Sequence, residues 1–409
     1  MPGMDRREFL SRSAAAGLGL GLAPLAGVAG AAVEPPRVRR SVRLGRTGLQ
    51  ISDIGFGSSR LSGDEALVRI ALDRGITYFD TADGYTGGAS ETTIGKALAG
   101  VRERVVIASK QKTAATDDRA AMMRALEASL RRLATDRIDV YFMHAVNDVA
   151  RIRNPEWPEF VARAKQQGKI RFAGMSGHGG QLAACVDAAL DADVVDVMLL
   201  AYNYGQDPSF MQKFTAHMDF VAVQDELPRV LAKAKQQDVG VVAMKTLRGA
   251  RLNDMRPYET GGATFAQAAF RWVLSDPKVD ALVVTMRSRE EIDEYLVASG
   301  SGPATADDAA LLQRYEERNG DTQCRYGCGA CGSACPEGVP IAEVLRTRMY
   351  AEDYRDAPLA RAEYAALGAG ASACVSCSHQ ACRDACPFGL AIPELTGRTH
   401  RTLAPGAAR

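Results

Sequence analysis

Short apolar runs alternate with amphipathic stretches through the middle of the chain. Eight nearly continuous apolar runs are predicted to be buried strands, at Ile51–Gly57, Thr77–Thr81, Val105–Lys110, Ile138–His144, Ile170–Ser176, Val194–Tyr202, Gly240–Lys245 and Ala281–Met286. Apolar residues at helical spacing lie between them and predict helices at Asp64–Arg74, Asp117–Leu133, Asp225–Gln237, Phe265–Leu274 and Glu290–Val297. This alternation predicts a parallel sheet covered by helices, because each parallel connection must cross back over the sheet.

The number of repeated units decides between two architectures that contain parallel sheets. Eight strand–helix units within residues 41–300 fit a closed (β/α)8 TIM barrel, which needs about 250 residues, better than an open doubly wound sheet. No GxGxxG sequence follows any predicted strand, so the main sign of a Rossmann-type sheet is missing. We therefore predict the fold class α/β, with a (β/α)8 barrel over residues 41–300.

Four residues that can hold or move a proton follow successive predicted strands. Asp80 ends the second strand, with Tyr85 five residues later, while Lys110 ends the third strand and His144 the fourth. Active sites of such barrels lie at the carboxyl ends of the strands, so these side chains are predicted to meet there. A lysine cation is expected to lower the pKa of a neighbouring tyrosine, with Asp80 keeping the lysine charged and His144 orienting a carbonyl group. Each residue alone also fits a structural role, and their common register favours catalysis.

Several motifs in this region resemble the aldo/keto reductase superfamily. They are FDTADGY, SETTIGKAL, VVIASK, DVYFMH and GKIRFAGMS, in that order, and the entry segment RLGRTGL (43–49) resembles the hairpin that plugs the bottom of the barrel. The resemblance implies a catalytic tetrad of Asp80, Tyr85, Lys110 and His144. In that tetrad Tyr85 is the acid that protonates a carbonyl oxygen after hydride transfer. A small carbonyl or alcohol compound is the implied substrate.

The same resemblance implies a nicotinamide site, NAD or NADP, that this sequence matches in part. Ser176 matches the serine that binds the carboxamide, whereas Met244 replaces the usual aromatic residue and Lys245 follows it. Arg287 and Arg289 are candidates for binding the cofactor's phosphate at a helix start. The alternative for both arginines is an ordinary solvated position at the beginning of a helix.

Eight of the nine cysteines lie between Cys324 and Cys386, and the ninth, Cys185, is predicted to be a core residue. They form two motifs, Cys324-x3-Cys328-x2-Cys331-x3-Cys335-Pro and Cys374-x2-Cys377-x4-Cys382-x3-Cys386-Pro, joined by a helical spacer over Ile341–Leu367. The repeat resembles ferredoxins with two 4Fe–4S clusters, and predicts a small α-rich module over residues 318–398.

The ferredoxin resemblance implies a crossed ligand arrangement, in which the last cysteine of each motif serves the other cluster. One cluster then has Cys324, Cys328, Cys331 and Cys386 as ligands, and the other has Cys335, Cys374, Cys377 and Cys382. Both spacings contain inserted residues, among them His379, which is interpreted as a solvated loop residue with ligation as the alternative. Paired zinc sites and disulfides remain the alternatives for the whole module.

The N-terminus resembles a twin-arginine signal peptide over residues 1–31. Arg6 and Arg7 precede a short apolar stretch that ends in a small-residue cleavage site at Ala29-Gly30-Ala31. This predicts a periplasmic or otherwise exported protein that is a partner of the twin-arginine export machinery, with a basic membrane anchor as the alternative. The net charge of +1 argues against a nucleic-acid partner.

Two hypotheses for function follow from these features. The first is an exported oxidoreductase that converts a carbonyl/alcohol pair and passes electrons through iron–sulfur clusters to or from a redox partner protein. The second is a barrel without catalytic activity that serves as an electron carrier or assembly subunit.

Overall fold

The computed structural model describes residues 34–179, 181–206, 226–247, 255–319, 324, 329–352 and 356–406. The chain from Pro36 to Arg409 forms one compact unit. The predicted signal peptide, residues 1–31, lies outside the described residues and stays a prediction.

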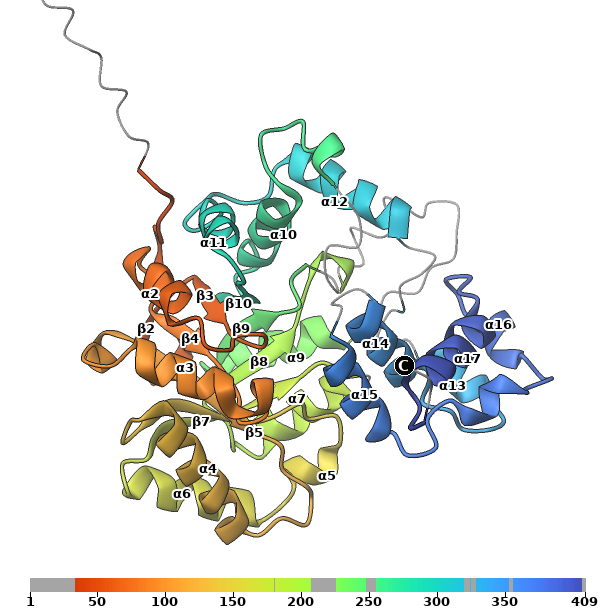
Figure 1. The fold of residues 1–409 in the computed structure, drawn as a ribbon, viewed down its shortest axis with the longest axis horizontal. Coiled ribbons are helices and arrows are strands. Elements are labelled where there is room, and N and C mark those ends of the chain that lie inside the picture. The colour runs from red at the N-terminus through yellow and green to blue at the C-terminus, as the bar shows by residue number, and fades with distance from the viewer. Residues whose placement is uncertain are drawn as a thin grey trace, which may run out of the picture. The chain divides into compact units, whose positions relative to one another are not determined.

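Eight parallel strands close into a barrel in the order β10-β3-β4-β5-β6-β7-β8-β9 (Figure 1). The strands are β3 (Ile54–Gly57), β4 (Tyr78–Asp80), β5 (Val106–Gln111), β6 (Ile138–Met143), β7 (Ile170–Gly177), β8 (Val197–Ala201), β9 (Gly240–Met244) and β10 (Ala281–Thr285). Each of them lies within a predicted strand or differs from it by one residue at an end. The predicted α/β class and (β/α)8 barrel are confirmed.

Helices cover the outside of the barrel, and several begin at a side-chain cap. They are α2 (Glu65–Asp73), α3 (Ala89–Ala97), α4 (Arg119–Leu133), α5 (Val149–Ile152), α6 (Glu156–Gln166), α7 (Leu182–Asp191), α9 (Leu227–Gln236), α10 (Phe265–Leu274), α11 (Arg289–Leu296) and α12 (Ala306–Asn319). Thr264 and Gln267 form a capping box, which explains why α10 begins where the sequence predicts. The other predicted helices are confirmed to within two residues at each end.

The first predicted strand, Ile51–Gly57, is two separate strands. Its first part forms β2 (Gln50–Ser52), which pairs antiparallel with β1 (Ser41–Arg43), and its second part enters the barrel as β3. The chain turns at Asp53, whose carboxylate accepts hydrogen bonds from the Ser299 hydroxyl at 2.6 Å and the Gly300 amide at 2.7 Å. This buried polar anchor breaks the apolar run.

The β1–β2 hairpin closes the amino-terminal end of the barrel, as the sequence predicts. Its apolar side chains join the residues inside the barrel in one core cluster that includes Leu44, Ile51, Phe142 and Val242. Gly45 has φ +46° and lies against the backbone of Gly240, where a Cβ atom would approach the amide nitrogen to 2.2 Å. Only glycine fits this contact.

The chain continues into a small helical module after α12. The module contains α13 (Ala330–Ala334), α14 (Ile341–Glu352), α15 (Ala357–Ala365), η7 (Ser372–Val375), α16 (Ala381–Asp384) and α17 (Ile392–Leu403). The predicted helical spacer Ile341–Leu367 is therefore two helices. The second begins at a new cap, because the Asp356 carboxylate accepts a hydrogen bond from the Leu359 amide.

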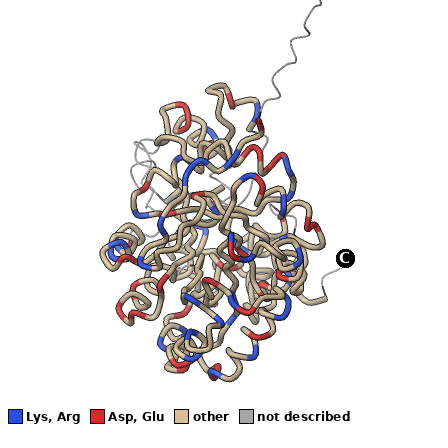
Figure 2. Tube along the Cα trace, turned by 90° about the vertical axis from the view of Figure 1, so that its left-hand side faces the viewer, with Lys and Arg blue, Asp and Glu red and all other residues tan. Residues whose placement is uncertain are grey.

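Charged residues of both signs are interspersed along the trace (Figure 2), in keeping with the nearly balanced composition. In the part of the chain that the structure describes, no helix is long and apolar enough to cross a membrane.

Candidate active site

A buried ion pair lies at the carboxyl ends of two neighbouring strands, β4 and β5. The Lys110 ammonium group donates to the Asp80 carboxylate and to the Thr81 carbonyl oxygen, each at 2.6 Å. The lysine side chain is 1% exposed and the aspartate side chain 5%. Each of the two residues thus supplies the charged partner that the other requires when it is buried.

Tyr85 and His144 complete the group that the sequence predicts. Tyr85 follows β4 in the short helix η3 (Tyr85–Gly88), and its ring centroid lies 4.9 Å from the Lys110 nitrogen. The rings of Tyr85 and His144 meet edge-on, with centroids 5.6 Å apart. The structure therefore brings Asp80, Tyr85, Lys110 and His144 together at one end of the barrel.

The electrostatics of this group differ in one respect from the expectation. Burial raises the pKa of Tyr85 well above its ordinary value, and the Asp80 charge raises it further. The expected decrease is not seen, because burial disfavours the charged phenolate and is the largest influence on this pKa. Burial also raises the pKa of Asp80 and lowers that of Lys110, and each shift is opposed by the partner's charge. Tyr85 is therefore a neutral hydroxyl donor.

Two histidines near this group are neutral at physiological pH. Burial lowers the pKa of His144 well below its ordinary value, and the charge of Lys110 lowers it further. The pKa of His178 falls for the same reason, with Lys245 as the next largest cause. The Nδ1 atom of His178 is buried and has no hydrogen-bond partner among the described residues. Neutral imidazoles can orient a carbonyl or an amide by hydrogen bonding.

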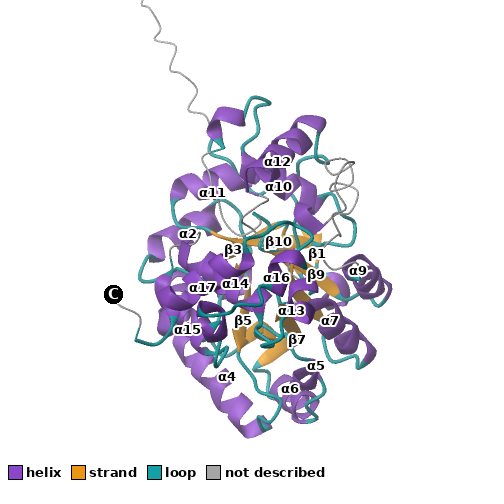
Figure 3. Cartoon of the chain, turned by 90° about the vertical axis from the view of Figure 1, so that its right-hand side faces the viewer, coloured by secondary structure: helices purple, strands orange, loops and turns teal. Residues whose placement is uncertain are grey.

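The helical module contacts the same end of the barrel (Figure 3). Lys112 after β5 binds Glu363 of α15 at 2.8 Å, and Asn147 after β6 donates to Glu343 of α14 at 3.2 Å. Lys245 after β9 donates to the Tyr350 hydroxyl of α14 at 3.2 Å. The module thus forms part of the wall around the tetrad.

Sequence reasoning missed Glu343, Tyr350 and Glu363, because it treated Ile341–Leu367 only as a spacer between cysteine motifs. One signal was present. Arg346 and Tyr350 are four positions apart, so they share one helix face and give that face a charged and an aromatic group.

The predicted cofactor residues lie in two places. The Ser176 hydroxyl is buried and accepts a hydrogen bond from the Ala145 amide at 3.0 Å, and the half-buried Met244 packs against the core inside the barrel. Arg287 and Arg289 are exposed at the start of α11, where Glu291 and Asp293 bind them at 2.6 and 3.7 Å. Ser176 and Met244 thus lie at strand ends, whereas both arginines have the arrangement expected of surface ion pairs.

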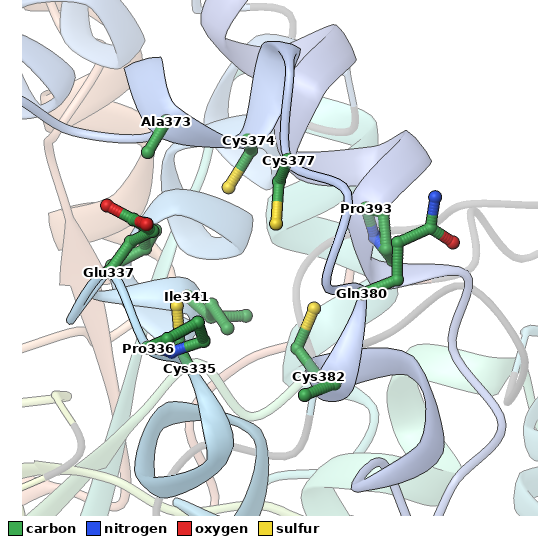
Figure 4. Close-up of a pocket in the computed structure, with 12 residues that line it drawn as sticks. Cys335, Pro336, Glu337, Ile341, Ala373, Cys374, Cys377, Gln380, Cys382 and Pro393 are labelled. Atoms are coloured by element: carbon green, nitrogen blue, oxygen red, sulfur yellow. The ribbon is translucent and has the colours of Figure 1, made fainter.

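Four cysteines line one pocket in the helical module. Cys335 comes from the end of α13, and Cys374, Cys377 and Cys382 come from the second motif. Figure 4 shows their sulfur atoms directed toward a common space. These are the same four cysteines that the crossed arrangement groups together.

The remaining predicted ligands are described only in part. Cys324, Cys331 and Cys386 pack against the module's core, and Cys328 lies outside the described residues. Every cysteine within the described ranges is free of disulfide bonds, including the buried Cys185. In the same ranges, no group of three or more His, Cys, Asp or Glu side chains is arranged to hold a single metal ion. His379 is exposed, in a loop before α16.

Comparison with known proteins agrees with this geometry. Residues 53–317 match the aldo/keto reductase family. The chain belongs to this family. It is therefore an oxidoreductase with an aldo/keto reductase barrel and additional C-terminal helices.

Individual relatives match between 62% and 69% of this chain. L-galactose dehydrogenase of Arabidopsis thaliana is 26% identical over 292 residues, which are 62% of this chain and 86% of the relative. The uncharacterized oxidoreductase YrpG of Bacillus subtilis is 28% identical over 62% of this chain and 89% of its own length. An aldo/keto reductase from Klebsiella pneumoniae, solved in complex with NADPH, is 26% identical with a TM-score of 0.53, over 69% of this chain and 95% of its own.

Proposed function

We propose that this aldo/keto reductase reduces a carbonyl compound with NADPH, or oxidises the corresponding alcohol with NADP. The observation that carries the proposal is the buried Lys110–Asp80 pair below Tyr85, with the neutral His144 at the ring edge. When bound, the nicotinamide supplies or accepts a hydride.

The protein supplies the proton and its position. In the reductive direction the carbonyl carbon receives hydride and the Tyr85 hydroxyl donates its proton to the carbonyl oxygen, which gives the alcohol. The resulting phenolate is stabilised by the Lys110 cation, whose nitrogen lies 4.9 Å from the ring centre. His144 holds the carbonyl oxygen in line by a hydrogen bond.

The end of β7 fits a nicotinamide carboxamide. Ser176 lies there with a buried hydroxyl, and two residues later His178 has a buried ring nitrogen without a partner among the described residues. An unpartnered buried nitrogen is costly unless a ligand satisfies it. Ser176 and His178 would thus hold the carboxamide, Met244 would contact the ring, and Lys245, Arg287 and Arg289 would contact phosphates.

The Tyr85→Phe variant tests the proposed catalysis. It is expected to lower the rate of NADPH-dependent carbonyl reduction by about 10²–10⁴-fold, because it removes the proton donor and leaves the nucleotide site intact. Tyr78→Phe is the matched control, since the Tyr78 hydroxyl is buried in the barrel and has no hydrogen-bond partner among the described residues. An unchanged rate in Tyr85→Phe, or no NADPH binding by the wild-type protein, would favour a barrel without catalytic activity.

We also propose that the module holds two 4Fe–4S clusters that exchange single electrons with a redox partner. The pocket shared by Cys335, Cys374, Cys377 and Cys382 supports one of them, since four thiolates from two chain segments match the crossed arrangement. The other would use Cys324, Cys328, Cys331 and Cys386. The thiols fit a cluster better than zinc, because paired zinc sites normally use two CxxC knuckles with a long spacer, whereas each motif here ends in Cys-Pro.

Metal analysis of the full chain, purified without oxygen, tests this second proposal. We expect iron and acid-labile sulfide in equal amounts, and visible absorption that bleaches on reduction. Cys374→Ser should lower the iron content, and Cys185→Ser should leave it unchanged because Cys185 is buried in the barrel. Stoichiometric zinc with little iron would contradict the proposal.

The twin-arginine signal completes the proposed function, because this route exports proteins that have folded and acquired their cofactors. Replacement of Arg6 and Arg7 by lysine should retain the protein in the cytoplasm of its host. Export of that variant would contradict the assignment.

A further inference from the structure

The backbone turn that follows β6 carries His144, and its conformation is unusual. Ala145 has φ 51°, in the left-handed region that is unfavourable for a residue with a side chain. Such conformations persist where the surrounding structure holds them, and they concentrate at functional sites. The turn therefore needs contacts that fix it. It also decides where the His144 imidazole points, because the ring and the turn share one backbone.

The amides of this turn are held by the two neighbouring strands. The His144 amide donates to the Gln111 carbonyl oxygen at the end of β5, at 2.8 Å. On the side of β7, the Ala145 amide donates to the Ser176 hydroxyl at 3.0 Å and the Val146 amide donates to the Ser176 carbonyl oxygen at 2.7 Å. The carbonyl oxygens of the turn need partners of their own.

Arg151 binds two of these carbonyl oxygens. One terminal nitrogen of its guanidinium group donates to the His144 oxygen at 2.8 Å, and the other donates to the Ala145 oxygen at 2.9 Å. The nitrogen that binds His144 also donates to the Thr113 hydroxyl after β5, at 3.4 Å. A guanidinium group is planar and presents its donors as a rigid fork, so it fixes two successive carbonyl groups relative to each other.

The helix α5 places Arg151 behind the turn. This short helix begins at Asp148, whose carboxylate accepts a hydrogen bond from the Ala150 amide at 2.9 Å. Charged side chains that leave water are usually paired with an opposite charge. The hydrogen bonds of the half-buried Arg151 to described residues instead go to uncharged oxygens. Its donors are thus used to hold the backbone of the turn.

The charge of Arg151 also acts on the imidazole of His144. Burial is the largest cause of the lowered pKa of His144, and four cations lower that pKa further: Lys110 on β5, Lys112 just after it, Arg151, and Lys245 after β9. Each of them disfavours the protonated imidazole, because like charges repel. A neutral imidazole is the form that orients a carbonyl group without competing for the proton of Tyr85.

We propose that Arg151 is a positioning residue for His144, whose turn it holds so that the imidazole meets the edge of the Tyr85 ring and reaches the carbonyl oxygen of the substrate. Arg151 acts through His144 and not on the substrate itself. The inference rests on the proposed carbonyl reduction, in which His144 orients the carbonyl group. It extends the tetrad by a residue that follows no strand directly.

A double-mutant cycle over Arg151 and His144 tests this role. Arg151→Met is expected to lower kcat/KM for NADPH-dependent carbonyl reduction by about 10- to 100-fold, because a displacement of about 1 Å can cost about 10²-fold in rate. In the His144→Ala background the same substitution should change kcat/KM by less than about twofold, since the side chain that Arg151 positions is absent. Arg153→Met removes an exposed arginine of the same segment and should have little effect in either background. Equal losses for Arg151→Met in both backgrounds would overturn the inference.

The contact between the two rings gives a readout that does not depend on activity. In protein labelled at histidine and tyrosine, we expect a nuclear Overhauser effect between the ring hydrogens of His144 and Tyr85, whose centroids are 5.6 Å apart. Arg151→Met should weaken this effect and raise the pH at which His144 is protonated. Arg151→Lys should restore part of both, because lysine keeps the charge but lacks the fork.

An unchanged ring contact in the Arg151→Met variant would overturn the inference. If the wild-type protein reduces no carbonyl compound but the ring contact responds as expected, Arg151 remains the positioning residue of His144 and the proposed reductase activity fails.

Discussion

The barrel and the helical module differ in the size and composition of their cores. The barrel has continuous apolar layers inside and outside its strands, with buried aromatic side chains such as Phe56, Trp157 and Phe270. The module has a small core, and the side chains packed against it include Cys324, Cys331, Cys335, Cys374, Cys382 and Cys386. The barrel buries a large apolar core, whereas the small core of the module fits the pattern of small domains that need a metal or cross-links.

The largest expected effect is the loss of the module's structure when its thiols are disabled. Combined Cys335→Ser and Cys374→Ser substitutions should abolish the module's cooperative unfolding transition, because the proposed clusters would supply much of its folding free energy. The barrel's transition should remain. Calorimetry and limited proteolysis after residue 319 would measure both. A module that keeps its transition without iron would show that burial stabilises both regions alike.

The same contrast explains what the sequence could predict. Strands buried on both faces form continuous apolar runs, so all eight barrel strands were predictable, and Asp80, Lys110 and His144 could be placed at their ends. Two features could not be predicted from the sequence, because they depend on tertiary contacts. The pKa of Tyr85 is set by burial, which a linear sequence does not show, and Tyr350 reaches the barrel only because the module docks there.

The Trp157→Ala substitution tests whether a close-packed apolar core stabilises the barrel. The Trp157 side chain is 1% exposed and its ring lies 5.4 Å from that of Phe160. Its removal should lower the free energy of unfolding by about 3–5 kcal/mol, because a cavity remains in a close-packed core. Denaturant titration with separate probes should show this loss in the barrel transition, with the module's iron content unchanged. A decrease in unfolding free energy below about 1 kcal/mol would contradict this, because it would mean that the barrel core repacks to fill the cavity.

Acidification tests the electrostatics at the barrel's mouth. The pKa values of His144 and His178 are lowered in the folded protein, so protons bind the unfolded chain first as the pH falls below about 6.5. Their contribution to stability is therefore complete above that pH and is lost below it. Between pH 7.5 and 5.5 each histidine should cost about 1 kcal/mol of barrel stability.

The His144→Gln and His178→Asn variants are the corresponding controls. Each variant should lower the slope of the barrel's unfolding free energy against pH. The decrease should correspond to one proton fewer taken up on unfolding at acidic pH. An unchanged slope in both variants would place the responsible groups elsewhere.

The smallest effect concerns the contact between the two regions. Lys112 is 59% exposed and Glu363 15%, so their ion pair at 2.8 Å is largely screened by solvent. Lys112→Gln should therefore lower the unfolding free energy by only about 0.2–1 kcal/mol, and added salt should remove the difference. Glu363→Gln should cost more, because Glu363 also binds the buried Arg346 at 3.2 Å.

A double-mutant cycle over Lys112 and Glu363 separates these contributions. We expect the coupling energy of the pair to be below about 1 kcal/mol. A coupling of several kcal/mol, insensitive to salt, would mean that this contact locks the module onto the barrel. The position of Tyr350 against Lys245 at the end of β9 would then depend on this ion pair. A weak coupling instead leaves that position to the hydrogen bonds that Lys245 and Arg346 donate to Tyr350.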